Sequence, residues 1–486
     1  MNRRVILHTV GQIIKIEAAL LVLPLLVSLI YREYPGALSF AVTAAVALVV
    51  GFVLTLTNRR GDRRIFARGG LVSVALSWIA LSLIGALPFV ISGEIPSYVD
   101  ALFETVSGFT TTGASVLKNP EVLSHGMLFW RSFTHWIGGM GVIVLMMAIL
   151  PADSGRAIHI MRAEMPGPIV GKLVPRLRDT AKILYLIYIA LTAAQIVFLV
   201  CGGMPLFDSA LHAFGTAGTG GFGIKASSIG EYSAYSQWVI AIFMLIFGIN
   251  FNVYQLVLMR RFRSALRSSE MWCYLSIVAV ATLIITVNLL PQLAFPEALR
   301  HAVFQVASIS TTTGYSSVDF DLWPGLSKAV LVLLMFMGAC AGSTAGGLKV
   351  SRVMLLFKSV RRDLRRIVHP RSVNSVQLEG KKVDDTTLNG VGAYFVLYMM
   401  CIAAVFVCLA FEPVAEGFNY LETHFTAAVA CFNNVGPGLD GVGPMMNYGG
   451  YSVLSKLILS LAMLLGRLEI YPLLVVLSPT TWSKKH

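Results

Sequence analysis

Long apolar segments, separated by shorter polar ones, make up most of the chain. A helix needs about 20 mostly apolar residues to cross a bilayer. By that rule ten spanning helices are expected, the eighth of them interrupted, near residues 11–31, 37–57, 70–92, 127–150, 182–203, 236–258, 271–292, 327–357, 390–411 and 452–477. The pattern predicts an all-α polytopic membrane protein whose two ends lie on the same side.

The polar segments differ in charge from one side to the other. One set is rich in basic residues: Arg3, Arg4, Arg59, Arg60, Arg63, Arg64, Arg68, Arg156, Arg162, Lys172, Arg176, Arg178, Arg260, Arg261, Arg263, Arg267 and the block from Lys349 to Lys382. The opposite set has few basic residues: Arg32, Lys118, Arg131, Lys225, Arg300 and Lys328. Because cytoplasmic loops carry the excess of Lys and Arg, both termini are expected in the cytoplasm.

The opposite, outer loops are acidic. Their acidic residues are Glu94, Asp100, Glu104, Glu121, Asp208, Glu231, Glu297, Asp319, Asp321, Glu412, Glu416, Glu422 and Asp440. Acidity on one face raises the local concentration of cations. The alternative is that these loops are acidic only because Lys and Arg are kept in the cytoplasm, and the residues alone leave both interpretations open.

Composition supports the membrane class. Hydrophobic residues make up 56% of the chain and charged residues only 13%, against roughly 25% charged in soluble domains. The net charge of +13 is explained by the basic loops, so no nucleic-acid partner is expected. The six cysteines form no CxxC pair, and no HExxH, nucleophile elbow, P-loop or dinucleotide fingerprint is present. We therefore expect neither an enzyme nor a cofactor bound by this chain.

A tetrapeptide containing glycine recurs four times in the outer loops. The copies are Thr110-Thr111-Thr112-Gly113, Gly218-Thr219-Gly220-Gly221, Thr311-Thr312-Thr313-Gly314 and Asn433-Asn434-Val435-Gly436, and their final glycines are 108, 93 and 122 residues apart. Each copy follows a span and a short semi-polar helical stretch, and a second span follows it. Repetition at this period indicates one supersecondary unit used four times.

This repetition predicts four pseudo-symmetric helix–pore loop–helix repeats around one central pore. The expected boundaries are 70–180, 181–270, 271–389 and 390–486, preceded by two additional transmembrane helices in 1–69. Backbone that is not helical survives at membrane depth only where it lines a water-filled cavity or is buried in protein. Four such loops would offer rings of carbonyl oxygens to a dehydrated cation. A plain extracellular turn is the alternative for any single copy, but the fourfold recurrence favours a cation filter.

A glycine-rich run interrupts the eighth predicted span. Glycine costs about 1 kcal/mol in a helix interior, so we expect an irregular loop below the filter that acts as a gate. The alternative is a close helix–helix contact through small residues. Arg467, in the last span, would be either a barrier to cations inside the pore or a side chain that reaches the cytoplasmic edge. The candidate gate residues are Gly338, Gly342, Ser343, Thr344, Gly346, Gly347, Lys349 and Arg467.

Several stretches, distributed over essentially the whole chain, resemble the TrkH/TrkG potassium-uptake subunits of the Trk/Ktr/HKT superfamily. They are FETVSGFTTTGAS (103–115), HWIGGMGVIVLMMAILP (135–151), RAEMPGP (162–168), TGGFG (219–223), STTTGYS (310–316), GACAGSTAGGLKV (338–350), FNNVGPGL (432–439) and LLGRLEIYPLLVV (464–476).

The resemblance implies potassium uptake across the bacterial inner membrane by a homodimer. It implies that K⁺ binds at the four tetrapeptides, that the glycine-rich run is the gate and that Arg467 lines the pore beside it. It also implies a cytoplasmic nucleotide-binding regulatory subunit of the TrkA type, so nucleotide would act only through that partner. The basic segment 351–385 would contact anionic lipid, dock this subunit, or do both. A proton- or sodium-coupled symporter of the same fold is the alternative function.

Overall fold

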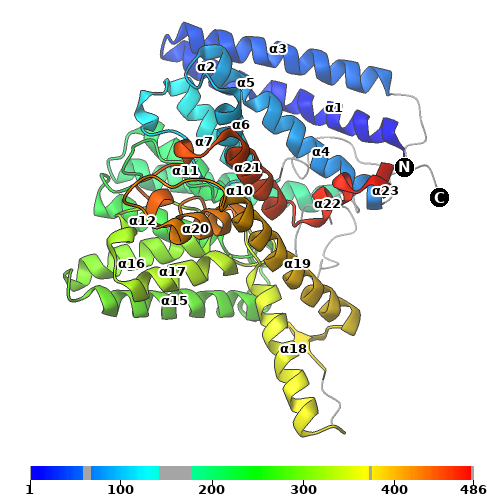
Figure 1. The fold of residues 1–486 in the computed structure, drawn as a ribbon, viewed down its shortest axis with the longest axis vertical. Coiled ribbons are helices and arrows are strands. Elements are labelled where there is room, and N and C mark those ends of the chain that lie inside the picture. Colours follow the sequence, from blue (N-terminus) through cyan, green and yellow to red (C-terminus); the bar gives the residue numbers. More distant parts are fainter. Residues whose placement is uncertain (1, 59–66, 142–176, 372–374, 483–486) are drawn as a thin grey trace.

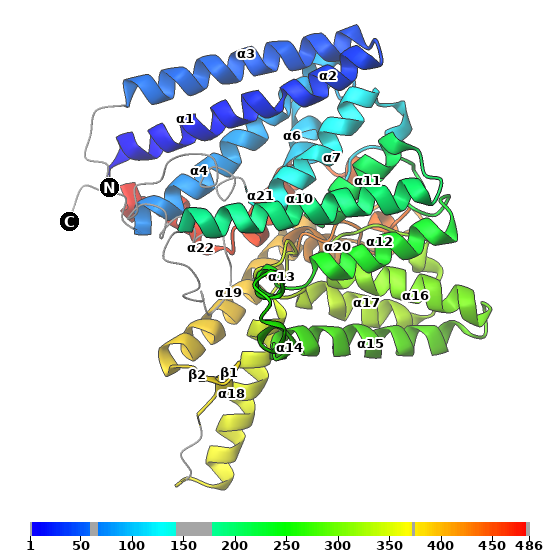
Figure 2. The ribbon, with the colours of Figure 1, turned by 180° about the vertical axis from the view of Figure 1, so that it is seen from behind.

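Long parallel helices form the body of the protein. The computed structural model describes residues 2–58, 67–141, 177–371 and 375–482. Within these ranges six helical segments are long and apolar enough to cross a membrane. They are α1 (Arg3–Leu20) with α2 (Val22–Ile30), α3 (Tyr34–Thr57), α4 (Ala67–Gly85) with α5 (Leu87–Ser92), α10 (Leu177–Cys201), α15 (Ser269–Leu289) and α19 (Asp385–Leu409). Helices α1, α3, α10 and α15 run along one common direction (Figures 1 and 2).

Four shorter helices lie among the spans and lead into the four tetrapeptides. They are α6 (Tyr98–Phe109), α11 (Leu206–Gly218), α16 (Phe295–Ser310) and α20 (Tyr420–Phe432). Each carries one acidic residue in its first turn, where the positive end of the helix dipole stabilises negative charge: Asp100, Asp208, Glu297 and Glu422. Lysines from neighbouring helices bind two of these carboxylates, with Lys456 Nζ 2.6 Å from Asp100 and Lys328 Nζ 3.2 Å from Glu422.

The helix that follows each tetrapeptide ends or bends partway along its length. These helices are α7 (His125–Gly139), α12 (Ala234–Phe247) with α13 (Phe251–Leu258), α17 (Gly325–Met337) with α18 (Val350–Val368), and α21 (Val453–Arg467) with α22 (Tyr471–Leu477). Helices α12 and α13 meet at 87°.

The eighth predicted span is interrupted as expected, and the fourth, sixth and tenth predicted spans differ from continuous helices in the same way. Glycines account for part of the difference, since Gly139 ends α7 and Gly248 lies in the α12–α13 bend. The break after α21 has no glycine, and the backbone there is left-handed at Glu469 (φ 56°) and Ile470 (φ 66°). The second half of the predicted fourth span, 142–150, lies outside the described residues, as do the basic residues predicted in 59–64 and 156–176.

The remaining elements are short. They comprise α14 (Phe262–Leu266), α23 (Pro479–Trp482), the single-turn helices η1 (Pro120–Val122), η2 (Phe320–Leu322), η3 (Asp440–Val442) and η4 (Tyr448–Gly450), and a hairpin of β1 (Gln377–Leu378) and β2 (Lys381–Lys382). In the hairpin Gln377 pairs with Lys382, a feature that the all-α prediction did not include. Helix α18 leaves the body and runs across the direction of α15 (Figure 2).

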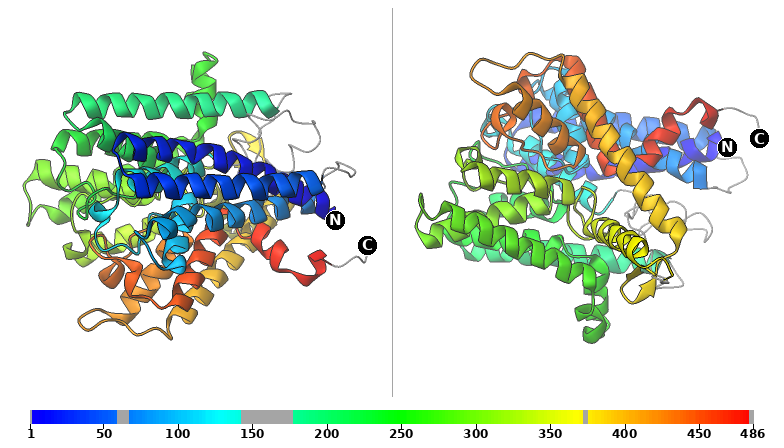
Figure 3. Two further views of the ribbon diagram at one scale, coloured as in Figure 1. Left: turned by 90° about the horizontal axis from the view of Figure 1, so that it is seen from above. Right: turned by 60° about the horizontal axis from the view of Figure 1, so that its bottom comes forward.

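The two ends of the described chain lie together. Arg3 Nη2 donates a hydrogen bond of 3.1 Å to the carbonyl oxygen of Trp482, and its guanidinium lies over the indole ring. Figure 3 shows α1 beginning beside α23. The outer surface of α3 exposes aliphatic side chains along its length, among them Leu38, Val49 and Leu56. Such a surface suits contact with lipid rather than water.

A buried ion pair fastens α6 to α7. Arg131 Nε lies 2.6 Å from Glu104 Oε1, and both side chains are almost fully shielded from solvent. The Glu104 carboxylate also accepts hydrogen bonds from Ser115 Oγ and the Val116 N–H. Arg131 Nη1 donates to the carbonyl oxygen of Gly223 at 2.8 Å. The prediction that Glu104 and Arg131 are charges of the outer loops is wrong, because they form part of the interior.

We predict that Arg131→Ala lowers the free energy of unfolding by about 3–5 kcal/mol, because it leaves Glu104 buried without its cation. The measurement is the thermal unfolding midpoint of the purified protein in detergent. Lys225→Ala is the matched control, since it removes a lysine from the solvent-exposed pair with Glu231 and should change the midpoint little. Equal midpoints for the two variants would contradict a structural role for the buried pair.

Candidate functional site

The four tetrapeptides share one backbone geometry. We name them loop 1 (110–113), loop 2 (218–221), loop 3 (311–314) and loop 4 (433–436). Each has a left-handed Thr or Asn, then one residue, then a left-handed glycine. The φ angles are 55° at Thr111, 56° at Thr219, 55° at Thr312 and 56° at Asn434, followed by 83° at Gly113, 79° at Gly221, 83° at Gly314 and 97° at Gly436.

This geometry begins as a helix C-cap of the Schellman type, in which an N–H bonds the carbonyl five residues earlier. The four equivalent bonds, all 2.8 Å long, are Thr112 N to Ser107 O, Gly220 N to Gly215 O, Thr313 N to Ser308 O and Val435 N to Ala430 O. The left-handed position of such a cap is usually glycine, and another residue there costs about 1–2 kcal/mol. All four loops accept this strain, and strained backbone persists at functional sites when the surroundings hold it in place.

Each left-handed glycine lies against the backbone of the next loop. A Cβ atom added to the glycine would come within 2.2 Å of Gly220 O at Gly113, 2.0 Å of Thr313 O at Gly221, 2.1 Å of Val435 O at Gly314 and 2.5 Å of Thr112 O at Gly436. No side chain fits such gaps. The contacts run from loop 1 to loop 2, loop 3, loop 4 and back to loop 1, so the four loops close a ring. The structure therefore brings together the residues that the sequence singled out in four separate places.

Side chains from outside the tetrapeptides support this ring. The buried His135 ring contacts Gly108 O through Nδ1 at 2.7 Å and the Phe222 N–H through Nε2 at 3.3 Å. The Tyr448 hydroxyl donates to Gly436 O at 2.8 Å. Neither residue is among the predicted site residues, although His135 begins the stretch 135–151, one of those that carry the resemblance.

A loop at residues 338–349 separates α17 from α18, and we name it loop 338–349. It is not helical, as its glycines predict. Its two ends pair with each other, since Val350 N bonds Ala339 O at 3.0 Å and Leu348 N bonds Phe336 O at 3.3 Å. The loop therefore begins and ends at one place, and its middle reaches away toward the ring.

Loop 338–349 contacts both the ring and the α12–α13 bend. Gly346 N donates to Thr312 Oγ1 of loop 3 at 2.6 Å. A Cβ atom at Gly346 would lie 2.5 Å from Asn433 O of loop 4, so only glycine permits this approach. On the other side, Cys340 N bonds Gly248 O at 3.1 Å and Phe251 N bonds Gly342 O at 3.0 Å.

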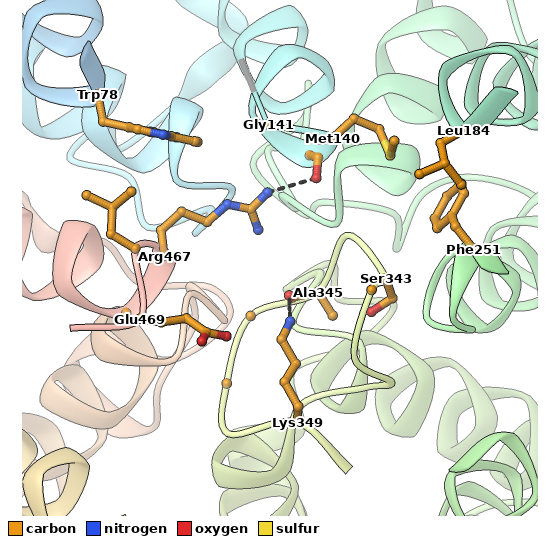
Figure 4. A pocket seen from close by; sticks show the side chains of 16 residues that line it. Trp78, Met140, Gly141, Leu184, Phe251, Ser343, Ala345, Lys349, Arg467 and Glu469 are labelled. Carbon is orange, nitrogen blue, oxygen red and sulfur yellow. Dashed lines mark hydrogen bonds between the residues drawn. The ribbon is translucent and has the colours of Figure 1, made fainter. Parts of the chain in front are cut away.

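Arg467 ties this loop to the end of α7. Its Nη1 donates to Thr344 O at 2.8 Å, and its Nη2 donates to Gly139 O at 2.8 Å and also to Gly138 O. Figure 4 shows the Arg467 side chain reaching toward the Met140 region and Lys349 reaching Ala345, whose carbonyl accepts a hydrogen bond from Nζ. The interpretation that Arg467 extends to the cytoplasmic edge does not describe this geometry.

Most of the candidate gate residues line one cavity. Those that do so are Gly342, Ser343, Gly346, Gly347, Lys349 and Arg467. The other two are nearby, because Thr344 bonds Arg467 and Gly338 lies against Gly346 O. Glu469, which also lines the cavity, binds Arg352 through both of its carboxylate oxygens. Neither this pair nor Glu270, whose carboxylate accepts a hydrogen bond from Ala341 N of loop 338–349, is among the predicted site residues.

The site contains no cluster of metal-ligating side chains: among the described residues, no three His, Cys, Asp or Glu side chains come together in a way that could hold a metal ion. Any cation at the ring would therefore meet backbone carbonyl and hydroxyl oxygens.

Comparison with known proteins gives consistent results. A family of proteins described as cation transport protein, TrkH, matches residues 38–484. The chain is 39% identical to the Trk system potassium uptake protein TrkH of Salmonella typhimurium over the full length of both, and 33% identical to TrkG of Escherichia coli over 99% of this chain and 98% of that one.

Among solved structures, the crystal structure of the potassium transporter TrkH from Vibrio parahaemolyticus superposes with a TM-score of 0.87 at 34% identity, covering 99% of this chain and all of the other. The multi-pass helical fold is thus that of a known membrane transporter. The chain belongs to the TrkH family of cation transport proteins, and it is a transporter rather than an enzyme.

Proposed function

We propose that this protein conducts potassium ions into a bacterial cell through the ring of loops 1–4, which acts as the selectivity filter. The observation that carries the proposal is the closed ring of glycine-to-carbonyl contacts. The relatives described above are potassium uptake proteins by name, which supports K⁺ as the ion. In this proposal segments 70–180, 181–270, 271–389 and 390–486 each contribute one corner of a central pore, and 1–69 contributes two helices outside it.

The backbone geometry supports ion binding. Left-handed residues alternate with others in each loop, and such alternation turns successive carbonyl groups toward the same side. A ring of these oxygens replaces the water molecules that a K⁺ ion loses on entry. Helices α6, α11, α16 and α20 end at the loops, so their negative dipole ends add a favourable potential for a cation there.

Loop 338–349 acts in this proposal as the gate in its closed position. Its backbone bonds loop 3 directly at Thr312, so it lies where an ion leaving the filter would pass. Arg467 holds the loop from one side and adds a positive charge that disfavours a cation. Opening requires the loop to give up its bonds to Thr312, Arg467 and Gly248.

We further propose a homodimer in the inner membrane, with both termini cytoplasmic and with a nucleotide-binding regulatory subunit of the TrkA type. Helix α18 supports a cytoplasmic contact surface. It runs across the direction of the spans (Figure 1), and Phe357 and Ile367 on its apolar side are 73% and 76% exposed. The apolar side suits the lipid interface, and its arginines suit an acidic partner or anionic headgroups.

Coupling to protons or sodium is the second candidate function. One observation favours it: Glu17 in α1 is buried, and neither of its carboxylate oxygens has a hydrogen-bond partner in the described part of the chain. An acidic residue inside a membrane is a functional candidate by default. Reversal potentials in proteoliposomes separate the two functions, because an uncoupled channel follows the K⁺ gradient alone and a symporter also follows the gradient of H⁺ or Na⁺.

We predict that Gly314→Ser abolishes selectivity for K⁺ over Na⁺ and lowers K⁺ flux at least about tenfold, because the new Cβ would meet Val435 O at 2.1 Å and force loops 3 and 4 apart. Flux of both ions into proteoliposomes is the measurement. Gly203→Ser is the matched control, since Gly203 has the same backbone (φ 84°) with nothing within 4 Å of its Cβ position. Unchanged selectivity in the Gly314 variant would refute the filter.

We predict that Arg467→Ala raises basal K⁺ flux measured without any regulatory subunit. The reason is that loop 338–349 loses its bond at Thr344 while the pore loses a positive charge. Arg467→Lys separates the two effects, because it keeps the charge but cannot span both Thr344 and Gly139. High flux in both variants identifies the hydrogen bonds as decisive, and high flux in the Ala variant alone identifies the charge. Normal flux in both would exclude a gating role for Arg467.

We predict that replacing Arg361, Arg365 and Arg366 together by Gln weakens binding of a TrkA-type subunit from the same host about tenfold at physiological salt, while basal K⁺ flux stays unchanged. Binding to the protein in nanodiscs, measured over a range of salt concentrations, tests this. The same change at Arg260, Arg261 and Arg263 is the control for total charge. Equal binding by the two triple variants and the unmodified protein would show that α18 is not the docking surface.

A further inference from the structure

Glu270 is a buried acidic residue next to loop 338–349. It is the second residue of α15, in the first turn of that helix, and only 5% of its surface is exposed. A carboxylate buried in this way is costly unless hydrogen bonds or charges compensate it. The groups that contact Glu270 must therefore compensate its buried carboxylate.

Both hydrogen bonds of Glu270 Oε1 come from main-chain N–H groups on either side of the loop. Ala341 N, in the first half of loop 338–349, donates at 2.7 Å. Ser351 N, in the first turn of α18, donates at 3.2 Å. A single oxygen thus joins the loop to the helix that follows it. The N-terminal dipole of α15 also stabilises the negative charge, so the carboxylate is held in place from both sides.

Asn250 connects the same carboxylate to the bend between α12 and α13. Asn250 Oδ1 accepts the N–H of Asn252 at 2.9 Å and so caps the start of α13. The Asn250 side chain also interacts with Glu270, leaving its amide as the group that faces the carboxylate. The neighbouring Phe251 N bonds Gly342 O. Three segments that meet under the ring therefore converge on one side chain.

We propose that Glu270 is a positioning residue that holds loop 338–349 in its closed position. We name its hydrogen bonds to Ala341 N and Ser351 N the latch. The inference rests on the proposed gating function of the loop. It adds that Glu270, which is not one of the proposed pore-lining residues, controls the position of this loop. The loop leaves the pore only if Ala341 N, or Ala341 N and Ser351 N together, separate from Glu270. Removal of the carboxylate shifts the loop toward open conformations, whereas an amide that can still accept both bonds retains part of the latch.

The first measurement is basal K⁺ flux into proteoliposomes without a regulatory subunit. A hydrogen bond to a charged group contributes about 1.5–3 kcal/mol, so Glu270→Ala is expected to raise flux about tenfold or more, and Glu270→Gln is expected to raise it less. Glu379→Ala is the matched control, because Glu379 bonds Ser268 at the start of the same helix but has no bond to the loop. It is expected to leave flux unchanged.

The second measurement reports on the loop itself. Cys340 lies next to Ala341 and is fully buried, and Cys431, in α20, is equally buried. Alkylation of each thiol by a membrane-permeant maleimide, quantified by peptide mass spectrometry, gives the exposure of the loop with an internal reference. Glu270→Ala should speed alkylation of Cys340 but not of Cys431. Glu270→Gln shows how much of the change comes from removing negative charge near the thiol.

The outcomes separate the latch from the gate. If Arg467→Ala raises flux and Glu270→Ala does not, the latch is wrong and the gate remains. If neither raises flux, the proposed gate itself fails. Equal acceleration at Cys340 and Cys431 would mean general loosening and would also overturn the latch. Should Glu270→Ala not yield folded protein, Glu270→Asp, which shortens the reach to Ala341 by one carbon, takes its place with the same expected direction.

Discussion

The close approach of four glycines to the carbonyl groups of their neighbouring loops is the contact on which the rest of the structure depends. Each approach leaves no room for a Cβ atom, and in each loop a left-handed residue stands two positions before the glycine. Non-helical backbone buried in protein must find its hydrogen bonds within the protein, and here helix caps and neighbouring loops supply them. The buried pair of Glu104 and Arg131, the His135 ring and the Tyr448 hydroxyl all serve this requirement.

The same constraint explains the breaks in the helices that follow the loops. Arg467 can reach loop 338–349 and the end of α7 only because α7 stops at Gly139 and exposes its last carbonyl groups. Likewise the bend at Gly248 frees a carbonyl for Cys340. Carbonyl groups that a continuous helix would have used internally become the partners of the loop below the ring. The breaks and the loop therefore form one hydrogen-bonded unit.

Much of the fold and of the candidate site could be predicted from the sequence. The features that could not be predicted depend on tertiary packing. Apolar length predicted the six long apolar helical segments, though not the breaks that shorten the other predicted spans. The recurring tetrapeptides predicted where the short helices end. Glycine content predicted the loop after Met337. The left-handed backbone at Ile470 could not be predicted, because β-branched residues rarely adopt a positive φ. The partners of Glu104 and Glu270 could not be predicted either, because 27 and 71 residues separate Glu104 from Arg131 and Glu270 from Ala341, and only tertiary packing joins them.

The four loops belong to one polypeptide, and their sequences differ. Only loop 3 bonds loop 338–349 through a threonine hydroxyl, while the corresponding hydroxyl of Thr111 in loop 1 has no partner in the described part of the chain. In an assembly of four identical subunits, a segment such as loop 338–349 would be present next to each of the four loops. Four copies would then collide in the space that one copy fills. Joining the corners in a single chain removes this conflict. Each loop and the helices around it are free to differ, so loop 3 bonds loop 338–349 while Arg467, from the last part of the chain, bonds the same loop from another side.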